Sequence, residues 1–173
     1  MPKLTLLYTI SVDGWIADPN GRTPFSEASW ERYRTLAGAC GHLIMGRTTY
    51  ELFRVDRSIA PMPIKTIDVL SRTARAADEG VSFYRSVEEL QTSLASRGGE
   101  QMLVLGGART ASALTAAGMI SQIILLIDSV ILGGGIPLFD RALSSARVSR
   151  RSVDAHHPDF TEVRYELRAR EGV

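Results

Sequence analysis

The chain of 173 residues contains one cysteine, Cys40, and no surplus of charge of either sign. A single thiol excludes an internal disulfide and a thiolate metal cluster, and it is typical of a reducing compartment. The 20 basic and 19 acidic residues give a formal charge of +1. Without a strong positive field, we expect no binding to nucleic acid or to an anionic membrane, so any bound anion must be held by a local group of residues.

Export signals and long hydrophobic runs are also missing. The apolar run over residues 1–8 is short and lacks the small-residue pattern of a signal-peptide cleavage site. The stretch over residues 119–132 is interrupted by Asp128 and other polar residues, and it is shorter than the ~20 residues that a membrane helix needs. These absences predict a cytoplasmic protein.

The histidines do not form a metal-binding motif. His156 and His157 are adjacent and precede Pro158, without a third ligand or the spacing of a helical metal site. We therefore predict no bound metal.

What the sequence does contain is a regular alternation of strand-like and helix-like segments. Hydrophobic residues make up 45% of the chain, which is enough for a core without crosslinks. Short apolar runs bounded by turn residues predict strands over residues 3–10, 42–45, 65–70, 81–84, 102–105 and 123–127. The last run is almost entirely apolar, as is typical of a strand covered on both faces in a parallel sheet.

Helices are predicted between these strands. We expect Ser29 to cap a helix over residues 30–39, and Ser86 with Glu89 forms a capping box at the start of another. Two further helices follow glycine-containing turns, and Gly118 ends the second of them.

The last part of the chain has a different pattern. Residues 147–153 and 161–167 predict a terminal antiparallel hairpin. The fold class is therefore α/β, with a mostly parallel central sheet, a C-terminal antiparallel hairpin and helices on both faces. Residues 1–173 are expected to form a single domain.

Two of the strand-to-helix turns combine glycine with arginine and hydroxyl side chains. Their sequences are Gly46-Arg47-Thr48-Thr49 and Gly106-Gly107-Ala108-Arg109-Thr110. Glycine lets the backbone approach an anion, while the first helical turn offers unpaired N–H groups and the positive end of the helix dipole. The combination suits a phosphate, and a tight structural turn is the alternative interpretation.

Ser71 and Arg72 end a third strand with the same chemistry. Ligands of open parallel sheets bind beyond the carboxyl ends of the strands, and a dinucleotide needs several separated anion contacts. Arg47 and Arg72 suit a 2′-phosphate, which favours NADPH over NADH. Taken singly, an exposed arginine is more often a solvated surface charge.

The order of these motifs resembles the dihydrofolate reductase-like fold, and especially its riboflavin-biosynthesis reductase branch, over nearly the whole chain. The matching segments are residues 11–17 (SVDGWIA), 44–51 (IMGRTTYE), 70–72 (LSR), 105–107 (LGG) and 133–139 (GGGIPLF). Each segment is short, and their order and spacing make the resemblance specific.

This resemblance implies a three-layer fold that binds NADPH. The implied cofactor contacts fall into four groups: residues 46–49 at the phosphates, residues 106–110 at the pyrophosphate, Leu70, Ser71 and Arg72 at the adenosine end, and Thr9, Ile16 and Ala17 at the nicotinamide end. Dihydrofolate reductases hold the pterin ring with a carboxylate early in the first helix, whereas alignment on Tyr33 and Gly46 puts Ser29 near that place. The riboflavin-type branch implies a ribosylamino-pyrimidine phosphate as substrate.

Candidates for substrate binding and proton transfer are fewer. Asp13 follows the first predicted strand, where it either contacts the substrate or stabilises an Asp-Gly turn. The candidate contacts for a flat ring are Asp13, Trp15, Trp30, Tyr33 and Phe53, although aromatics at helical spacing are more often core residues. Asp13 and Glu27 are the candidate catalytic residues, with ordered water as the alternative proton source.

Together these patterns predict an NADPH-dependent reductase of a small pyrimidine- or pterin-like substrate, in which the cofactor supplies the hydride. A non-catalytic nucleotide-binding protein is the main alternative, because the helix carboxylate is missing. An interaction protein is a third, built on the late apolar loop Ile136-Pro137-Leu138-Phe139. For the enzyme, the same loop predicts a homodimer.

Overall fold

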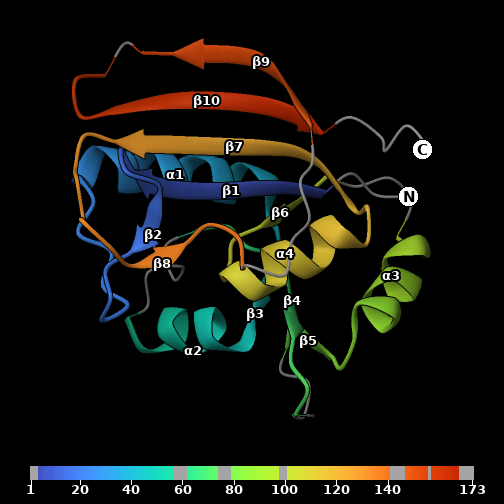
Figure 1. Cartoon of the computed structure of the whole chain (residues 1–173). Helices are drawn as coiled ribbons and strands as arrows, with labels where there is room; N and C mark the ends of the chain where they lie inside the picture. The colour runs from blue at the N-terminus through green and yellow to red at the C-terminus, as the bar shows by residue number, and fades with distance from the viewer. Residues whose placement is uncertain are drawn as a thin grey trace.

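The computed structural model describes residues 4–56, 62–73, 79–97, 101–140, 147–155 and 157–167 (Figure 1). Its centre is an eight-stranded sheet with the order β5-β4-β3-β6-β1-β7-β10-β9. These strands are β1 Leu4–Ser11, β3 His42–Gly46, β4 Thr66–Leu70, β5 Val81–Tyr84, β6 Met102–Val104, β7 Ile120–Asp128, β9 Val148–Asp154 and β10 Phe160–Leu167. Two short strands, β2 Trp15–Ala17 and β8 Ile136–Pro137, form a separate small sheet.

The strands from β5 to β7 in this order run parallel, and β10 is antiparallel to both β7 and β9. All residues of β1 are buried because the strand lies between β6 and β7 with helices on either face. The outermost strand β9 is mostly exposed. The predicted mostly parallel sheet with a C-terminal antiparallel hairpin is confirmed.

Helices cover both faces of the sheet, which gives three layers. The helices are α1 Glu27–Cys40, α2 Arg47–Asp56, α3 Val87–Ala95 and α4 Ala108–Ala116. On one face, α1 and α2 contribute Tyr33 and Tyr50 to a core cluster that includes Leu7. On the other face, α3 and α4 contribute Leu90 and Leu114 to a second cluster. The predicted placement of helices on both faces is also confirmed.

The first helix begins earlier than the sequence predicts. Ser26, not Ser29, is the N-cap of α1, because its Oγ accepts a hydrogen bond from the N–H of Ser29. Ser29 instead lies inside the first turn and is completely buried. Its hydroxyl donates to Asp128 on β7, a contact between distant parts of the chain that local sequence patterns do not reveal.

In the described part of the chain, no helix is both long and apolar enough to cross a membrane.

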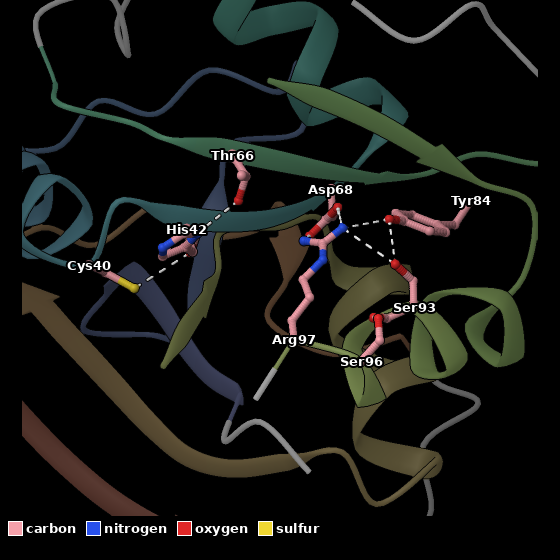
Figure 2. Close-up of polar contacts among 8 residues, drawn as sticks. All are labelled: Cys40, His42, Thr66, Asp68, Tyr84, Ser93, Ser96 and Arg97. Carbon is pink, nitrogen blue, oxygen red and sulfur yellow. Dashed lines mark hydrogen bonds and ion pairs between the residues drawn. The ribbon is translucent and has the colours of Figure 1, made fainter. Parts of the chain in front are cut away.

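A partly buried ion pair connects Arg97, just after the end of α3, to the sheet (Figure 2). Asp68 on β4 is 1% exposed, and its carboxylate accepts two hydrogen bonds from Arg97, at 2.6 and 3.0 Å. Arg97 also donates to the Tyr84 hydroxyl at 2.7 Å, and Tyr84 is hydrogen-bonded to Ser93. Because each polar group in this cluster has a partner, its burial is compatible with a stable fold.

Replacing Arg97 by methionine tests this interpretation. The change leaves the Asp68 carboxylate buried without its cation, a defect that typically costs about 3 kcal/mol or more. We expect the urea midpoint of unfolding at neutral pH to fall accordingly. The control is Arg151→Met, which removes a partner of Glu166 on the exposed hairpin and should leave the midpoint unchanged. Equal midpoints for Arg97→Met and the unmodified protein would contradict a stabilising role.

Candidate functional site

The residues predicted to bind a cofactor gather at the carboxyl ends of the parallel strands. Gly46 ends β3, Leu70 ends β4, and Gly106 follows the short strand β6. Because these strands are parallel and adjacent, their ends meet at one edge of the sheet. This edge is where open α/β sheets bind their ligands.

Two glycine turns meet at the centre of this edge. The N–H of Gly46 donates to the carbonyl oxygen of Gly106 at 2.7 Å. A side chain at Gly46 would place its first carbon 2.6 Å from Thr110 Oγ1. Gly106 has a φ of +132° and is joined to Gly107 by a cis peptide bond. Glycine at these positions therefore lets the starts of α2 and α4 approach one another closely.

The electrostatics of this meeting point favour an anion. The first turns of α2 and α4 contain no acidic residue, and Gly107 provides no side-chain cap to α4. Two positive helix-dipole ends therefore lie side by side, and their first-turn N–H groups have no acceptor among the described residues. Thr49 and Thr110 stand between them: a carbon added at Gly106 would lie 3.1 Å from Thr49 Oγ1. Among the described residues, neither threonine hydroxyl makes a hydrogen bond.

A third group extends the site toward β4. Arg47 Nη1 donates to Thr73 Oγ1 at 2.7 Å, and Ser71 Oγ donates to the Thr73 carbonyl oxygen at 2.8 Å. Thr73 thus joins two motifs that the sequence predicts separately. In the sequence, only its position directly after Ser71 and Arg72 indicates this role. Arg47 and Arg72 are exposed.

The remaining arginine of the predicted set stands apart. Arg109 in the first turn of α4 is 89% exposed, and its Nε lies 3.8 Å from Asp140 Oδ2. Thr48 in the first turn of α2 is exposed, and Ala108 in the first turn of α4 is half-buried.

Asp13 connects two loops at the same edge of the sheet, the turn after β1 and the loop after β7. Its Oδ1 accepts from the N–H of Leu132 at 3.1 Å, and its Oδ2 accepts from the N–H of Gly133 at 2.7 Å. Hydrogen bonding from the Ser11 side chain, together with these backbone bonds, lowers the pKa of Asp13 to about 2. The carboxylate is therefore ionised at neutral pH and occupied by backbone donors of a distant loop.

The small sheet completes this connection. Trp15 pairs with Pro137 and Ala17 pairs with Ile136. A side chain on Gly135 would lie 2.0 Å from the carbonyl oxygen of Ala17, so the two segments pack at backbone distance. Two of the residues predicted at the nicotinamide end, Ile16 and Ala17, belong to this sheet, which is too short to be recognised from periodicity.

The third residue of that group, Thr9, lies in β1. Its side chain is 5% exposed, and Thr9 Oγ1 is enclosed without a hydrogen-bond partner in the described part of the chain.

The predicted aromatic contacts divide into two groups. Tyr33 is buried in the core cluster between α1 and the sheet, and this burial raises its pKa. Trp30 packs edge-to-face on Tyr33 with ring centroids 5.4 Å apart, and Phe53 packs against the same cluster. Trp15 alone among them belongs to the small sheet at the site.

Glu27, the other candidate catalytic residue, is at the start of α1. Its side chain is 74% exposed and forms an ion pair with Arg34 on the same helix.

Sequence analysis missed Asp128 as a site residue. It ends β7 at the same edge, is 4% exposed and accepts hydrogen bonds from Ser26 and Ser29. In the sequence, the only indication of this residue is a single carboxylate at the end of an apolar strand. Among the described residues, no group of three or more histidine, cysteine, aspartate and glutamate side chains is placed to hold a metal ion.

With this geometry established, comparison with known proteins gives the family. The model of the RibD C-terminal domain matches residues 2–161. The chain belongs to the RibD C-terminal domain family. Within curated sequences, this RibD C-terminal domain is 28% identical over 155 residues to the uncharacterised protein YwjB of Bacillus subtilis, covering 86% of the chain and 89% of that protein.

Solved structures share the fold of this RibD C-terminal domain. A putative riboflavin biosynthesis protein from Shewanella sp. PV-4 superposes with a TM-score of 0.77 at 20% identity, over 96% of this chain and 99% of that one. A pyrimidine reductase-like protein from Corynebacterium diphtheriae gives 0.73 at 12% identity, over 97% and 92%.

A two-function protein from Thermotoga maritima is also similar. It is described as a diaminohydroxyphosphoribosylaminopyrimidine deaminase and 5-amino-6-(5-phosphoribosylamino)uracil reductase. The TM-score is 0.71 at 16% identity, over 96% of this chain and 56% of that one. These likenesses confirm the predicted dihydrofolate reductase-like fold of the riboflavin-reductase type.

The close contact at Gly135 leads to a test of the loop connection. Gly135→Ala places a carbon 2.0 Å from the Ala17 carbonyl oxygen, so β2 and β8 must separate. We expect faster amide hydrogen exchange at Leu132 and Gly133, whose N–H groups bind Asp13. Gly134→Ala is the matched control, since a carbon there meets no atom within 4 Å and no positive φ is required. Equal exchange in the two variants would show that the loops are not held through Gly135.

Proposed function

We propose that this RibD C-terminal domain is an NADPH-dependent reductase of a small heterocycle. The observation that carries the proposal is the meeting of the α2 and α4 N-termini at Gly46 and Gly106, with no carboxylate in either first turn. Like dipole ends repel one another, so their juxtaposition favours a bound group with negative charge. The pyrophosphate of a dinucleotide has that charge and the size to contact both turns.

The residues at the edge of the sheet fit the cofactor in separate groups. Thr49 and Thr110 would donate hydrogen bonds to the pyrophosphate, alongside the N–H groups of the two first turns. Arg47, fixed by Thr73, would pair with a 2′-phosphate, with Ser71 and Arg72 at the adenosine end. Thr9, Ile16 and Ala17 would lie at the nicotinamide end. Bound NADPH supplies a hydride equivalent for transfer to an electrophilic carbon.

The loops of the protein would orient the substrate and exclude water. In this proposal Asp13 is a positioning residue, because both of its oxygens hold the loop at Leu132 and Gly133 and its pKa of about 2 leaves no proton to donate. Trp15 would contact the heterocycle from the small sheet. The proton would come from Glu27 or from solvent.

The class of substrate is proposed from the relatives. The names of similar structures refer to riboflavin biosynthesis, to a pyrimidine reductase and to reduction of a phosphoribosylamino-uracil. We propose a pyrimidine of this type, with the reduction carried out in the cytoplasm.

The homodimer remains a prediction. In the apolar loop that motivates it, Ile136 is exposed, whereas Leu138 and Phe139 pack against the core of the same chain.

Thr110→Val tests the pyrophosphate site. The change keeps the side-chain shape and removes one hydrogen bond to a charged group, which typically weakens binding by roughly ten-fold or more. We expect this loss in the dissociation constant of NADPH, followed by quenching of tryptophan fluorescence. Thr115→Val is the matched control on the same helix, since the Thr115 hydroxyl donates to the Ala111 carbonyl within α4. An unchanged affinity in Thr110→Val would remove Thr110 from the site.

Arg47→Ala tests the choice of cofactor. Loss of the guanidinium should weaken NADPH binding by about ten-fold, because its hydrogen bonds go to a charged phosphate. Binding of NADH, which has no 2′-phosphate, should change little. Arg54→Ala at the other end of α2 is the control. If the unmodified protein bound neither cofactor, the proposed reductase function would be wrong.

A further inference from the structure

The guanidinium of Arg47 lies where a cation is unfavourable unless an anion binds beside it. Arg47 is the first residue of α2, at the positive end of the helix dipole. The first turn of this helix contains no acidic residue, and the Arg47 side chain is exposed. Among the described residues, its polar partner is the neutral hydroxyl of Thr73. The positive charge is therefore uncompensated within the described part of the chain.

Although it is exposed, this side chain is held in one direction. Arg47 Nη1 donates to Thr73 Oγ1 at 2.7 Å. The bond crosses from the start of α2 to the segment after β4, because Gly46 and Leu70 are opposite one another in the parallel register of β3 and β4. Fixing a long side chain before a ligand arrives reduces the entropy that is lost on binding.

Thr73 is itself held by a neighbour that is part of the sheet edge. Ser71 is 7% exposed, and its N–H donates to the carbonyl oxygen of Tyr84 on β5 at 2.9 Å. The Ser71 hydroxyl donates to the Thr73 carbonyl oxygen at 2.8 Å. Because that bond uses the only hydroxyl hydrogen of Ser71, Thr73 Oγ1 is the donor in its 3.3 Å contact with Ser71 Oγ. The acceptor for Arg47 is thus connected through Ser71 to β5.

The turn after β4 does not by itself require a hydroxyl at Thr73. The bond that closes the turn uses the Thr73 carbonyl oxygen, which a valine would retain. Thr73 is also exposed, so packing does not select threonine. What the hydroxyl adds is the acceptor for the guanidinium of Arg47.

We propose that Thr73 is a positioning residue that establishes the preference for NADPH over NADH by orienting Arg47 toward the 2′-phosphate. A guanidinium has five N–H donors, so the bond to Thr73 leaves the others for phosphate oxygens. Thr73 acts on the cofactor only through Arg47. This inference rests on the proposed function, because it assigns a further residue to the adenosine end of the same cofactor site.

The test compares the dissociation constants of NADP⁺ and NAD⁺ for the full chain, measured by calorimetry. The two cofactors differ only in the 2′-phosphate, so the ratio of their affinities isolates that contact. Thr73→Val keeps the side-chain shape and removes the acceptor for Arg47. We expect NADP⁺ to bind roughly five-fold more weakly, the effect of one hydrogen bond, with NAD⁺ binding unchanged.

Three further variants separate positioning from a structural role. Thr73→Ser restores the hydroxyl and should restore the affinity for NADP⁺. The double variant Arg47→Ala/Thr73→Val should bind NADP⁺ no more weakly than Arg47→Ala alone, because two residues that act through one contact are not additive. Thr92→Val is the matched control and should change neither constant, since this exposed threonine donates to the Glu88 carbonyl oxygen within α3.

The outcomes distinguish this inference from the proposed function. If Thr73→Val leaves NADP⁺ binding unchanged, or weakens NADP⁺ and NAD⁺ equally, Thr73 does not orient Arg47. If it weakens NADP⁺ binding further in the Arg47→Ala background, Thr73 contacts the phosphate independently and the positioning role is wrong. If the unmodified protein binds NADP⁺ and NAD⁺ equally, the inference fails while the pyrophosphate site stands. If it binds neither, the proposed function fails as well.

Discussion

The arrangement of the site depends on the contact between the ends of β3 and β6. One hydrogen bond, from the Gly46 N–H to the Gly106 carbonyl oxygen, continues the parallel pairing of these strands into the turns that follow. A β-carbon at Gly46 would lie 2.6 Å from the Thr110 hydroxyl, so any larger residue there would have to displace the Thr110 side chain. The positions of α2 and α4, and therefore of both positive helix ends, follow from it.

The loops at the other side of the edge are held by different interactions. A carboxylate at Asp13 accepts two backbone N–H groups, and Gly135 lets the small sheet close against Ala17. These contacts join segments that are more than a hundred residues apart in sequence. The site thus combines a rigid part, formed by strand ends and helix starts, with a pair of loops that form one unit.

Much of the fold could be predicted because short-range sequence patterns determine it. Apolar runs of strand length and the Ser86 cap of α3 have counterparts in the structure. The start of α1 could not be placed, because Ser26 and Ser29 are both acceptable caps and the choice depends on Asp128 across the chain. For the same reason, the sequence alone allowed Asp128 to be interpreted only as an interruption in an apolar run. Strands as short as β8, with two residues, have no periodicity to detect.

The polar groups packed against the sheet differ in how they are satisfied. Asp68 in the middle of β4 pairs with Arg97, Arg97 also donates to Tyr84 at the end of β5, and His42 pairs with Thr66 at the starts of β3 and β4 (Figure 2). At the carboxyl ends, the hydroxyls of Thr9, Thr49 and Thr110 have no partner in the described residues. In the proposed function, stability and ligand choice therefore depend on different polar residues. A lineage of such proteins can exchange one substrate for another through changes at the carboxyl edge while the polar contacts that hold the sheet remain untouched.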